Sequence, residues 1–304
     1  MNQVHTPVMV NEVVQYLEPE KENIYVDATI GAGGHAEALL NLGVRILGID
    51  QDEEILELTR QRLERFGDRV TLVNDNFKNL PQILERNNIK EVSGILYDLG
   101  LSTFQINSKR GFSFQSDCPL DMRMDGSLEF TAKDLVNEYP ENEICQIIQD
   151  YGQERWARGI ARSIVKNRPL STTGQLVEAI QRGIPRGAKY PKKIHYATRT
   201  FQAIRIAVND ELEILDSSLT VAINGLKEGG RIVVISFHSL EDRIVKWNFF
   251  QEAKEERLRI ITRKPIIPQE AEIISNPASR SAKLRVAEKV NGQPPVFSGQ
   301  TDSW

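Results

Sequence analysis

Short apolar segments alternate with helical patterns over the first hundred residues of the chain. The apolar segments are compact and rich in Val, Ile and Leu, which is typical of buried parallel strands. They span residues 24–28, 44–49, 69–73 and 94–98. Segments of helical periodicity lie between them, near residues 35–42, 52–66 and 80–87. Repeated strand–helix–strand units of this kind predict an α/β fold with an open, doubly wound sheet.

The alternation stops after residue 98 and resumes only with GGRIVVIS at residues 229–236. The segment between them has helical periodicity and helix-start signals, including the capping-box pattern Thr172-Thr173-Gly174-Gln175. The predicted helices span residues 141–150 and 154–167, a stretch from residue 172 onward, and residues 199–226. We therefore expect a helical domain, residues 107–199, inserted into an α/β core formed by residues 1–106 and 200–304.

The last part of the chain predicts a helix, two strands and a tail. The helix starts near Ser239, and strand patterns follow at residues 257–262 and 282–288. The final residues, NGQPPVFSGQTDSW, predict a loose tail.

The composition, 40% hydrophobic and 26% charged, is that of an ordinary soluble globular protein. No apolar run approaches the roughly 20 residues that span a bilayer, and the start of the chain lacks the pattern of a signal peptide. We therefore expect a cytoplasmic protein without membrane contact. Cys118 and Cys145 have neither a CxxC partner nor a nearby His cluster, so we expect inert thiols and no metal site.

Positive charge is concentrated in residues 155–199, which contain eleven Lys or Arg residues and a single acid, Glu178. The whole chain has a net charge of −4, so everything outside this segment sums to −14. Such polarity predicts a polyanionic partner, although a pair of solvated helix faces is the simpler alternative. Aromatic residues interleaved with these charges are candidates for stacking on bases: Trp156, Tyr190 and Tyr196.

The turn after the first predicted strand reads DATIGAGGHA over residues 27–36. Gly31, Gly33 and Ala36 satisfy the dinucleotide fingerprint G-x-G-x-x-G/A, and Asp50 ends the next strand, where an acid binds ribose hydroxyls. These residues predict a site for a ribose-bearing nucleotide. A tight turn without a ligand is the alternative.

Polar residues also follow the third and fourth predicted strands. Asp75-Asn76-Phe77 offers a polar group for an adenine edge and a ring for its face, and Asp98 ends the fourth strand. Taken singly, Asp75 fits a turn and Phe77 fits the core. Together with the glycine turn, the row resembles class I methyltransferases that use S-adenosylmethionine. A nicotinamide-dependent oxidoreductase is the alternative enzyme class.

Longer motifs resemble one family closely, in the right order from His5 to about residue 288. They are HTPVM, DATIGAGGH, GID, DLGLS, RGFSF, PLDMRMD, ATRTFQAIRIAVN and ISFHSLEDRIVK. These stretches are similar to those of the bacterial ribosomal small-subunit methyltransferase H family, also called MraW. The resemblance implies a Rossmann-like methyltransferase core with an inserted helical domain. It also implies methylation of the exocyclic N4 of a cytidine in the decoding centre of 16S rRNA, in the 30S subunit, with S-adenosylmethionine as cofactor.

By that resemblance, seven positions bind the methyl donor: Gly33, Gly34, His35, Asp50, Phe77, Asp98 and Gln105. The chain departs from the family at Phe104, where members commonly have proline in a Ser-Ser-Pro-Gln turn. Without that proline we expect a less rigid turn before Gln105.

Asp98 is the candidate catalytic residue. The lone pair of a cytosine N4 is delocalised into the ring, so a proton acceptor near the amine assists its attack on a methyl group. The alternative is that Asp98 binds only the methionine end of the donor. A third hypothesis for the whole chain is a non-catalytic RNA-binding assembly factor that retains the pocket.

The basic segment and two histidines supply the candidate contacts to RNA: Lys189, Lys192, Lys193, His195, Arg199 and His238. His238 precedes Ser239, which we expect to cap a helix, so a role at the helix N-terminus competes with acid–base work. His35 is expected to pack beside the donor, and His5 to close the site. The loop at residues 119–125 either lines the mouth between the domains or forms a salt-bridged turn.

Overall fold

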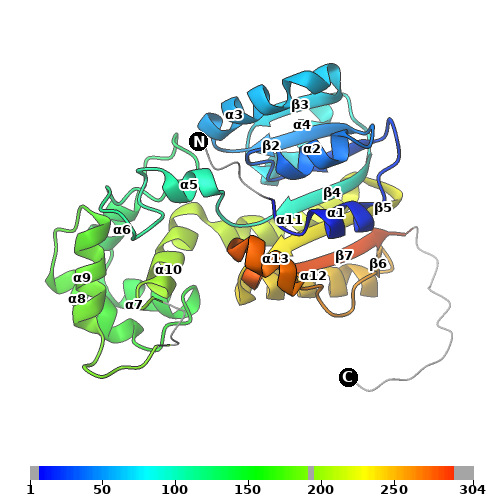
Figure 1. Cartoon of the computed structure of the whole chain (residues 1–304). Helices are drawn as coiled ribbons and strands as arrows, with labels where there is room; N and C mark the ends of the chain where they lie inside the picture. The colour runs from blue at the N-terminus through cyan, green and yellow to red at the C-terminus, as the bar shows by residue number, and fades with distance from the viewer. Residues whose placement is uncertain (1–6, 191–194, 291–304) are drawn as a thin grey trace. The chain divides into compact units, whose positions relative to one another are not determined.

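The computed structural model describes residues 7–190 and 195–290 and divides into two compact units (Figure 1). The sheet unit comprises the described residues up to Asp50, then Glu54–Gly100, and those from Ile214 onward. The helical unit comprises Gln51–Glu53 and Leu101–Glu213. The predicted tail after residue 290 lies outside the described residues.

The sheet unit is built on seven strands in the order β3-β2-β1-β4-β5-β7-β6. Strands β1 to β5 run parallel, whereas β7 runs antiparallel to both β5 and β6. Their bounds are β1 Ile24–Asp27, β2 Arg45–Asp50, β3 Val70–Asn74, β4 Val92–Asp98, β5 Leu226–Ser236, β6 Leu258–Ile260 and β7 Lys283–Lys289. Because β1, β2 and β4 are parallel, the carboxylates that end them, those of Asp27, Asp50 and Asp98, share one edge of the sheet.

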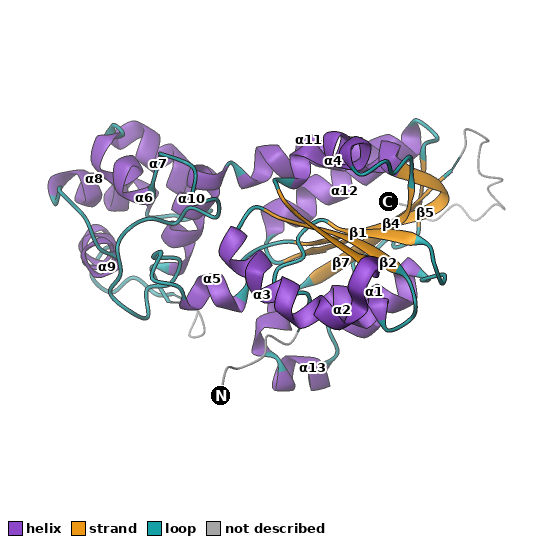
Figure 2. Ribbon diagram, turned by 90° about the horizontal axis from the view of Figure 1, so that it is seen from above, coloured by secondary structure: helices purple, strands orange, loops and turns teal. Residues whose placement is uncertain are grey.

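Helices cover both faces of this sheet (Figure 2). One face carries α1 Val10–Leu17, α2 Gly34–Leu40 and α3 Glu53–Leu63, and the other carries α4 Leu80–Arg86, α11 Glu211–Gly225 and α12 Ser239–Lys254. Each face has its own apolar core, so the central strands are buried on both sides as their continuous apolar runs predict. The short helix α13 Glu270–Ser275 and the 3-10 segments η1 Glu64–Arg69, η2 Phe77–Asn79 and η3 Pro277–Ser281 complete the unit.

The helical unit packs around a third apolar core. Its helices are α5 Thr103–Asn107, α6 Ala132–Glu138, α7 Glu141–Asp150, α8 Ala157–Lys166, α9 Thr173–Gly183 and α10 Thr198–Asn209. Helices α8 and α9 approach closely at two glycines: a Cβ added to Gly159 would lie 2.3 Å from the carbonyl oxygen of Gly183. Glycine at this crossing therefore allows backbone contact that a side chain would prevent.

The helical unit extends beyond the predicted bounds of 107–199 at both ends. At the C-terminal end, α10 contributes Phe201, Ile204 and Val208 to the core of this unit, so it does not join the sheet unit. The single predicted helix over 199–226 is also wrong. The chain breaks at Asp210, whose φ of 49° is left-handed, and α10 and α11 lie on either side of it.

Candidate active site

The glycine turn between β1 and α2 is held against the end of β2. Gly31 and Gly33 have φ values of +48° and +76°, which glycine adopts without strain. The amide of Gly31 donates a hydrogen bond of 3.0 Å to Oδ2 of Asp50. A Cβ on Gly33 would lie 3.1 Å from the methyl carbon of Thr59, so the backbone packs closely against α3. The turn thus brings the backbone of Gly31 and an acidic side chain together.

Two carboxyl groups lie at the ends of the central strands, one buried (Asp27) and one partly buried (Asp98). Asp27 is 1% exposed, and burial raises its pKa to about 7, an effect that the charge of Asp98 reinforces and that of His35 opposes. Burial, with a contribution from Glu241, likewise raises the pKa of Asp98 to about 7. A carboxyl group that titrates near neutral pH is suited to accepting a proton under physiological conditions.

The two oxygens of Asp98 have different surroundings. Oδ2 lies 3.5 Å from Nδ1 of His35. The backbone amide of Asp98 donates a separate 2.7 Å hydrogen bond to Oγ1 of Thr29. Its Oδ1 is buried and has no hydrogen-bond partner among the described residues. Buried acceptors are almost always paired in native proteins, so Oδ1 indicates a place for a donor or cation supplied by a ligand.

The residues after β3 separate into a turn and a ring. Asp75 accepts a 2.6 Å hydrogen bond from the side-chain amide of Asn79 and lies 3.5 Å from Arg86, as expected of a turn residue. Phe77 is half-buried against the core, with its ring 5.3 Å from that of Tyr97 and nearly perpendicular to it. Phe77 is half-exposed, and its stacking on an adenine ring stays a prediction.

Gln105 belongs to the helical unit, whereas the other six predicted donor-binding residues belong to the sheet unit. Its side chain forms a capping box with Ser102 at the start of α5, and its Nε2 donates a 3.2 Å hydrogen bond to Oδ2 of Asp52. Arg110 also pairs with Asp52. The capping box restrains the turn that lacks proline at Phe104, and the Ser-x-x-Gln spacing was a sequence signal for it.

The predicted RNA contacts do not form one group. Lys189 and His195 are exposed on the helical unit, where the ring of His195 stacks on Phe114 at 4.6 Å. Arg199 is half-buried and donates a 3.1 Å hydrogen bond to the carbonyl oxygen of Gln153. The predicted residues Lys192, Lys193 and His5 lie outside the described residues.

His238 lies in the sheet unit, apart in the chain from the basic segment. It is the N-cap of α12, because its Nδ1 accepts a 3.3 Å hydrogen bond from the backbone amide of Glu241. In return, the carboxylate of Glu241 accepts a hydrogen bond from the backbone amide of His238. The expectation that Ser239 caps this helix is therefore wrong; Ser239 is its first residue. The geometry gives His238 the helix N-terminal role that competed with acid–base work.

Three residues of the basic segment form a row on one helix face, which the charge count alone did not predict. Arg158, Arg162 and Lys166 are four residues apart along α8, and all three side chains are exposed. Arg162 lies 3.6 Å from Glu141, whereas no carboxylate of the described residues pairs with Arg158 or Lys166. The spacing of four was the available signal, and we call these three residues the α8 row.

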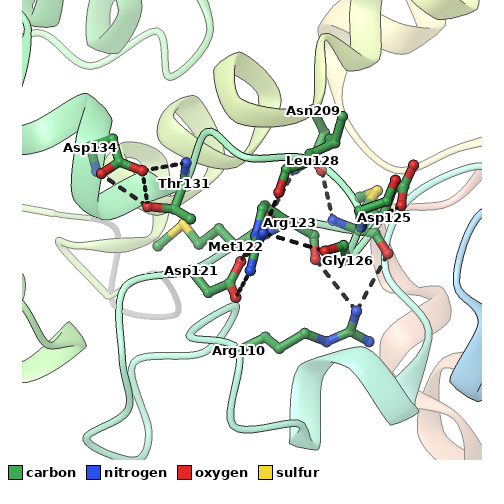
Figure 3. Close-up of polar contacts among 12 residues, drawn as sticks. Arg110, Asp121, Met122, Arg123, Asp125, Gly126, Leu128, Thr131, Asp134 and Asn209 are labelled. Atoms are coloured by element: carbon green, nitrogen blue, oxygen red, sulfur yellow. Dashed lines mark hydrogen bonds and ion pairs between the residues drawn. The ribbon is translucent and has the colours of Figure 1, made fainter.

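The loop at residues 119–125 is a salt-bridged turn within the helical unit (Figure 3). Arg123 donates to Asp121 at 2.7 Å and also bonds the carbonyl oxygen of Leu128. Asn209 of α10 fastens the loop by accepting from the amide of Met124 and donating to the carbonyl of Met122, at 2.7 and 2.8 Å. The loop thus forms these hydrogen bonds with itself and with α10, inside the helical unit.

Residues 7–190 and 195–290 contain no cluster of three or more His, Cys, Asp or Glu side chains arranged to hold a metal ion. Over the same residues, no helix combines the length and apolarity needed to cross a membrane.

A doubly wound sheet with an antiparallel seventh strand, a glycine turn after β1 and carboxylates closing β1, β2 and β4 defines a Rossmann-like methyltransferase. Residues 2–290 match the model of the MraW methylase family, and the chain belongs to this family.

Two similar relatives are each called ribosomal RNA small subunit methyltransferase H. The relative from Kosmotoga olearia is 49% identical over 95% of this chain and 98% of its own length. That from Thermotoga neapolitana is 51% identical over 94% of this chain and 96% of its own. Family membership confirms S-adenosylmethionine as the predicted cofactor and excludes the nicotinamide-dependent alternative.

Proposed function

We propose that this chain transfers a methyl group from S-adenosylmethionine to the exocyclic N4 of a cytidine in the decoding centre of 16S rRNA. The names of relatives 49% and 51% identical support small-subunit rRNA as the substrate. The motifs shared with the methyltransferase H family support the N4 position. A cytoplasmic location follows from a substrate that is part of the 30S subunit.

The observation that carries the proposal is the carboxyl group of Asp98. Its Oδ1 is buried and unpartnered among the described residues, and burial raises the pKa of Asp98 to about 7. An amine at this position donates an N–H to Oδ1, which withdraws the proton as the nitrogen lone pair becomes available. Asp98 therefore orients the amine and accepts its proton.

The sheet unit also fits the methyl donor. When bound, S-adenosylmethionine supplies an electrophilic methyl group on a positively charged sulfur. Gly31 is not packed against a side chain, Asp50 provides a carboxylate at the end of β2, and Phe77 is half-exposed after β3. Acidic residues at the ends of three strands favour a ligand that carries positive charge.

The helical unit supplies positive charge for the RNA backbone. The α8 row is exposed, and Arg155 links the start of α8 to the basic loop by donating to the carbonyl oxygen of Lys189 at 2.6 Å. Lys and Arg side chains that neutralise phosphates release counterions, which makes binding strongly salt-dependent. We propose that the α8 row and the loop at Lys189 contact phosphates.

Transfer of a labelled methyl group to purified small subunits tests the proposal. Subunits from cells lacking this protein should accept the label from the wild-type chain and far less from Asp98→Asn. If the chain binds the donor and the subunit but never transfers the label, it is a non-catalytic assembly factor and the proposal is wrong.

The RNA surface has a matched test. The double variant Arg158→Glu with Lys166→Glu reverses two charges on α8 and should weaken binding to the subunit and reduce the salt slope. Lys246→Glu with Lys254→Glu makes the same charge change at exposed positions on α12 and should have little effect. If both double variants lost the same affinity for the subunit, the effect would come from net charge alone. That result would refute the proposal that α8 contacts RNA.

A further inference from the structure

The hydrogen-bond partner of one imidazole nitrogen of His35 shows which nitrogen carries the hydrogen. Nε2 lies 2.8 Å from the carbonyl oxygen of Val8, and a carbonyl oxygen can only accept a hydrogen bond. Nε2 therefore carries the hydrogen. His35 is 5% exposed, and burial lowers its pKa, which favours the neutral ring. In the neutral ring with Nε2 protonated, Nδ1 has a bare lone pair.

The carbonyl of Val8, which selects this tautomer, is held in place by contacts of its neighbouring residues. The amide of Met9, the residue after Val8, donates a 2.7 Å hydrogen bond to Oε1 of Glu272 on α13. On the other side, Pro7 packs onto Gly34 so closely that a Cβ there would lie 2.8 Å from the proline ring. The segment at residues 7–9 is thus held between α13 and the first turn of α2.

The bare nitrogen faces the proposed base. Nδ1 lies 3.5 Å from Oδ2 of Asp98. In most histidine–carboxylate pairs the ring donates an N–H to the carboxylate and stabilises its charge. Here the ring presents a lone pair instead, which opposes the charged carboxylate and favours the protonated carboxyl group.

Among the other charged groups around this pair, Glu241 raises the pKa of Asp98, whereas Asp27 and Glu272 raise the pKa of His35 against the effect of its burial. The carboxylates that influence Asp98 and His35 come from β1, α12 and α13: Asp27, Glu241 and Glu272. Asp50 on β2 acts on Asp27. None of them supplies a positive charge that would stabilise an ionised Asp98.

We propose that His35 is a positioning residue whose Nδ1 lone pair, which faces Oδ2 of Asp98, raises the proton affinity of that carboxylate. The inference rests on the proposed function. As the N4 lone pair forms the new N–C bond, the electron pair of the broken C–S bond remains on sulfur. The N4 proton moves to Oδ1 of Asp98, and the Nδ1 lone pair beside Oδ2 favours this neutral form of the carboxyl group.

Nitrogen NMR of the ligand-free protein labelled with ¹⁵N-histidine reads the tautomer directly. The spectrum of His35→Gln identifies the His35 signals among those of the four histidines. At neutral pH we expect a protonated Nε2 and an unprotonated Nδ1. A protonated Nδ1 would overturn the inference, whether or not the chain methylates rRNA.

Two matched variants separate this role from packing. His35→Gln places its amide near Nε2 and keeps a donor for Val8, whereas His35→Asn places an amide near Nδ1, where its N–H₂ donates to Asp98. In single-turnover rates at saturating donor, His35→Asn should move the acid limb of the pH profile down by about one unit, because a hydrogen bond to the charged form stabilises it. His35→Gln should leave the limb near its wild-type position. The same limb in both variants would show a merely structural role, while no transfer by the wild type would instead refute the proposed function.

Discussion

Asp27 is a buried carboxyl group whose ionisation should destabilise the folded chain. Its carboxyl group is 1% exposed at the end of β1, and burial raises its pKa from 3.8 to about 7. The unfolded chain therefore loses this proton at a lower pH than the folded chain does. The contribution of Asp27 to the free energy of unfolding is therefore fully present below its unfolded pKa of about 4. This contribution is lost as pH rises through its folded pKa of about 7.

The size of this loss follows from the shift. A difference of roughly three pKa units corresponds to about 4 kcal/mol at 1.36 kcal/mol per unit, and this is an upper bound because His35 and Asp98 are coupled to Asp27. Asp27→Asn keeps the shape and the acceptor for the amide of Thr29, 3.4 Å away, without the charge. We expect this variant to be more stable than the wild type by about 2 to 4 kcal/mol at pH 8.

Urea denaturation at pH 4 and pH 8, followed by circular dichroism, measures the difference. The gain from Asp27→Asn should be large at pH 8 and small at pH 4, where the wild-type carboxyl is protonated in the folded state and only partly ionised in the unfolded state. Asp216→Asn, at an exposed position on α11, controls for general effects of the substitution. A gain independent of pH, or a loss of stability at pH 8, would refute the assignment of a raised pKa to Asp27.

Three further variants test the site and the RNA surface. Asp50→Ala should weaken binding of the demethylated donor by about 1 to 3 kcal/mol in calorimetry, because a hydrogen-bonded carboxylate is lost; unchanged affinity would remove Asp50 from the donor site. Asp98→Asn should lower the single-turnover rate at saturating donor by about 10²- to 10⁴-fold with little change in donor affinity, and a normal rate would eliminate its catalytic role. Replacing Lys189, Lys192 and Lys193 by Glu should weaken subunit binding and flatten its salt dependence while donor affinity is kept, and wild-type RNA affinity would leave these lysines as solvated surface.

Much of the sheet was predictable because its signals are local. The apolar runs that became β1, β2 and β4 are buried on both faces, and the polar residues that end them include Asp50 and Asp98. The helix break at Asp210 was missed because the apolar periodicity continues across it. Only the left-handed backbone at that residue, with Asn209 fastened to the loop at residues 122–124, ends α10.

The electrostatics of the site depend on contacts that no local pattern encodes. Met9 and Glu272 are 263 positions apart in the chain, yet their hydrogen bond helps to fix the carbonyl that selects the tautomer of His35. The burial of Asp27 likewise follows from the packing of whole elements. Sequence motifs predict that His35 and Asp98 lie near the donor, whereas the burial that shifts their pKa values comes from tertiary packing.

Mapping the methyl group in 16S rRNA tests the central claim most directly. Small subunits from cells lacking this protein are treated with the purified chain and isotopically labelled donor, and the rRNA is digested and analysed by mass spectrometry. The account predicts that the label appears as N4-methylcytidine at a single cytidine of the decoding centre. Label on another nucleotide or another atom of the base, or no label at all, would contradict it.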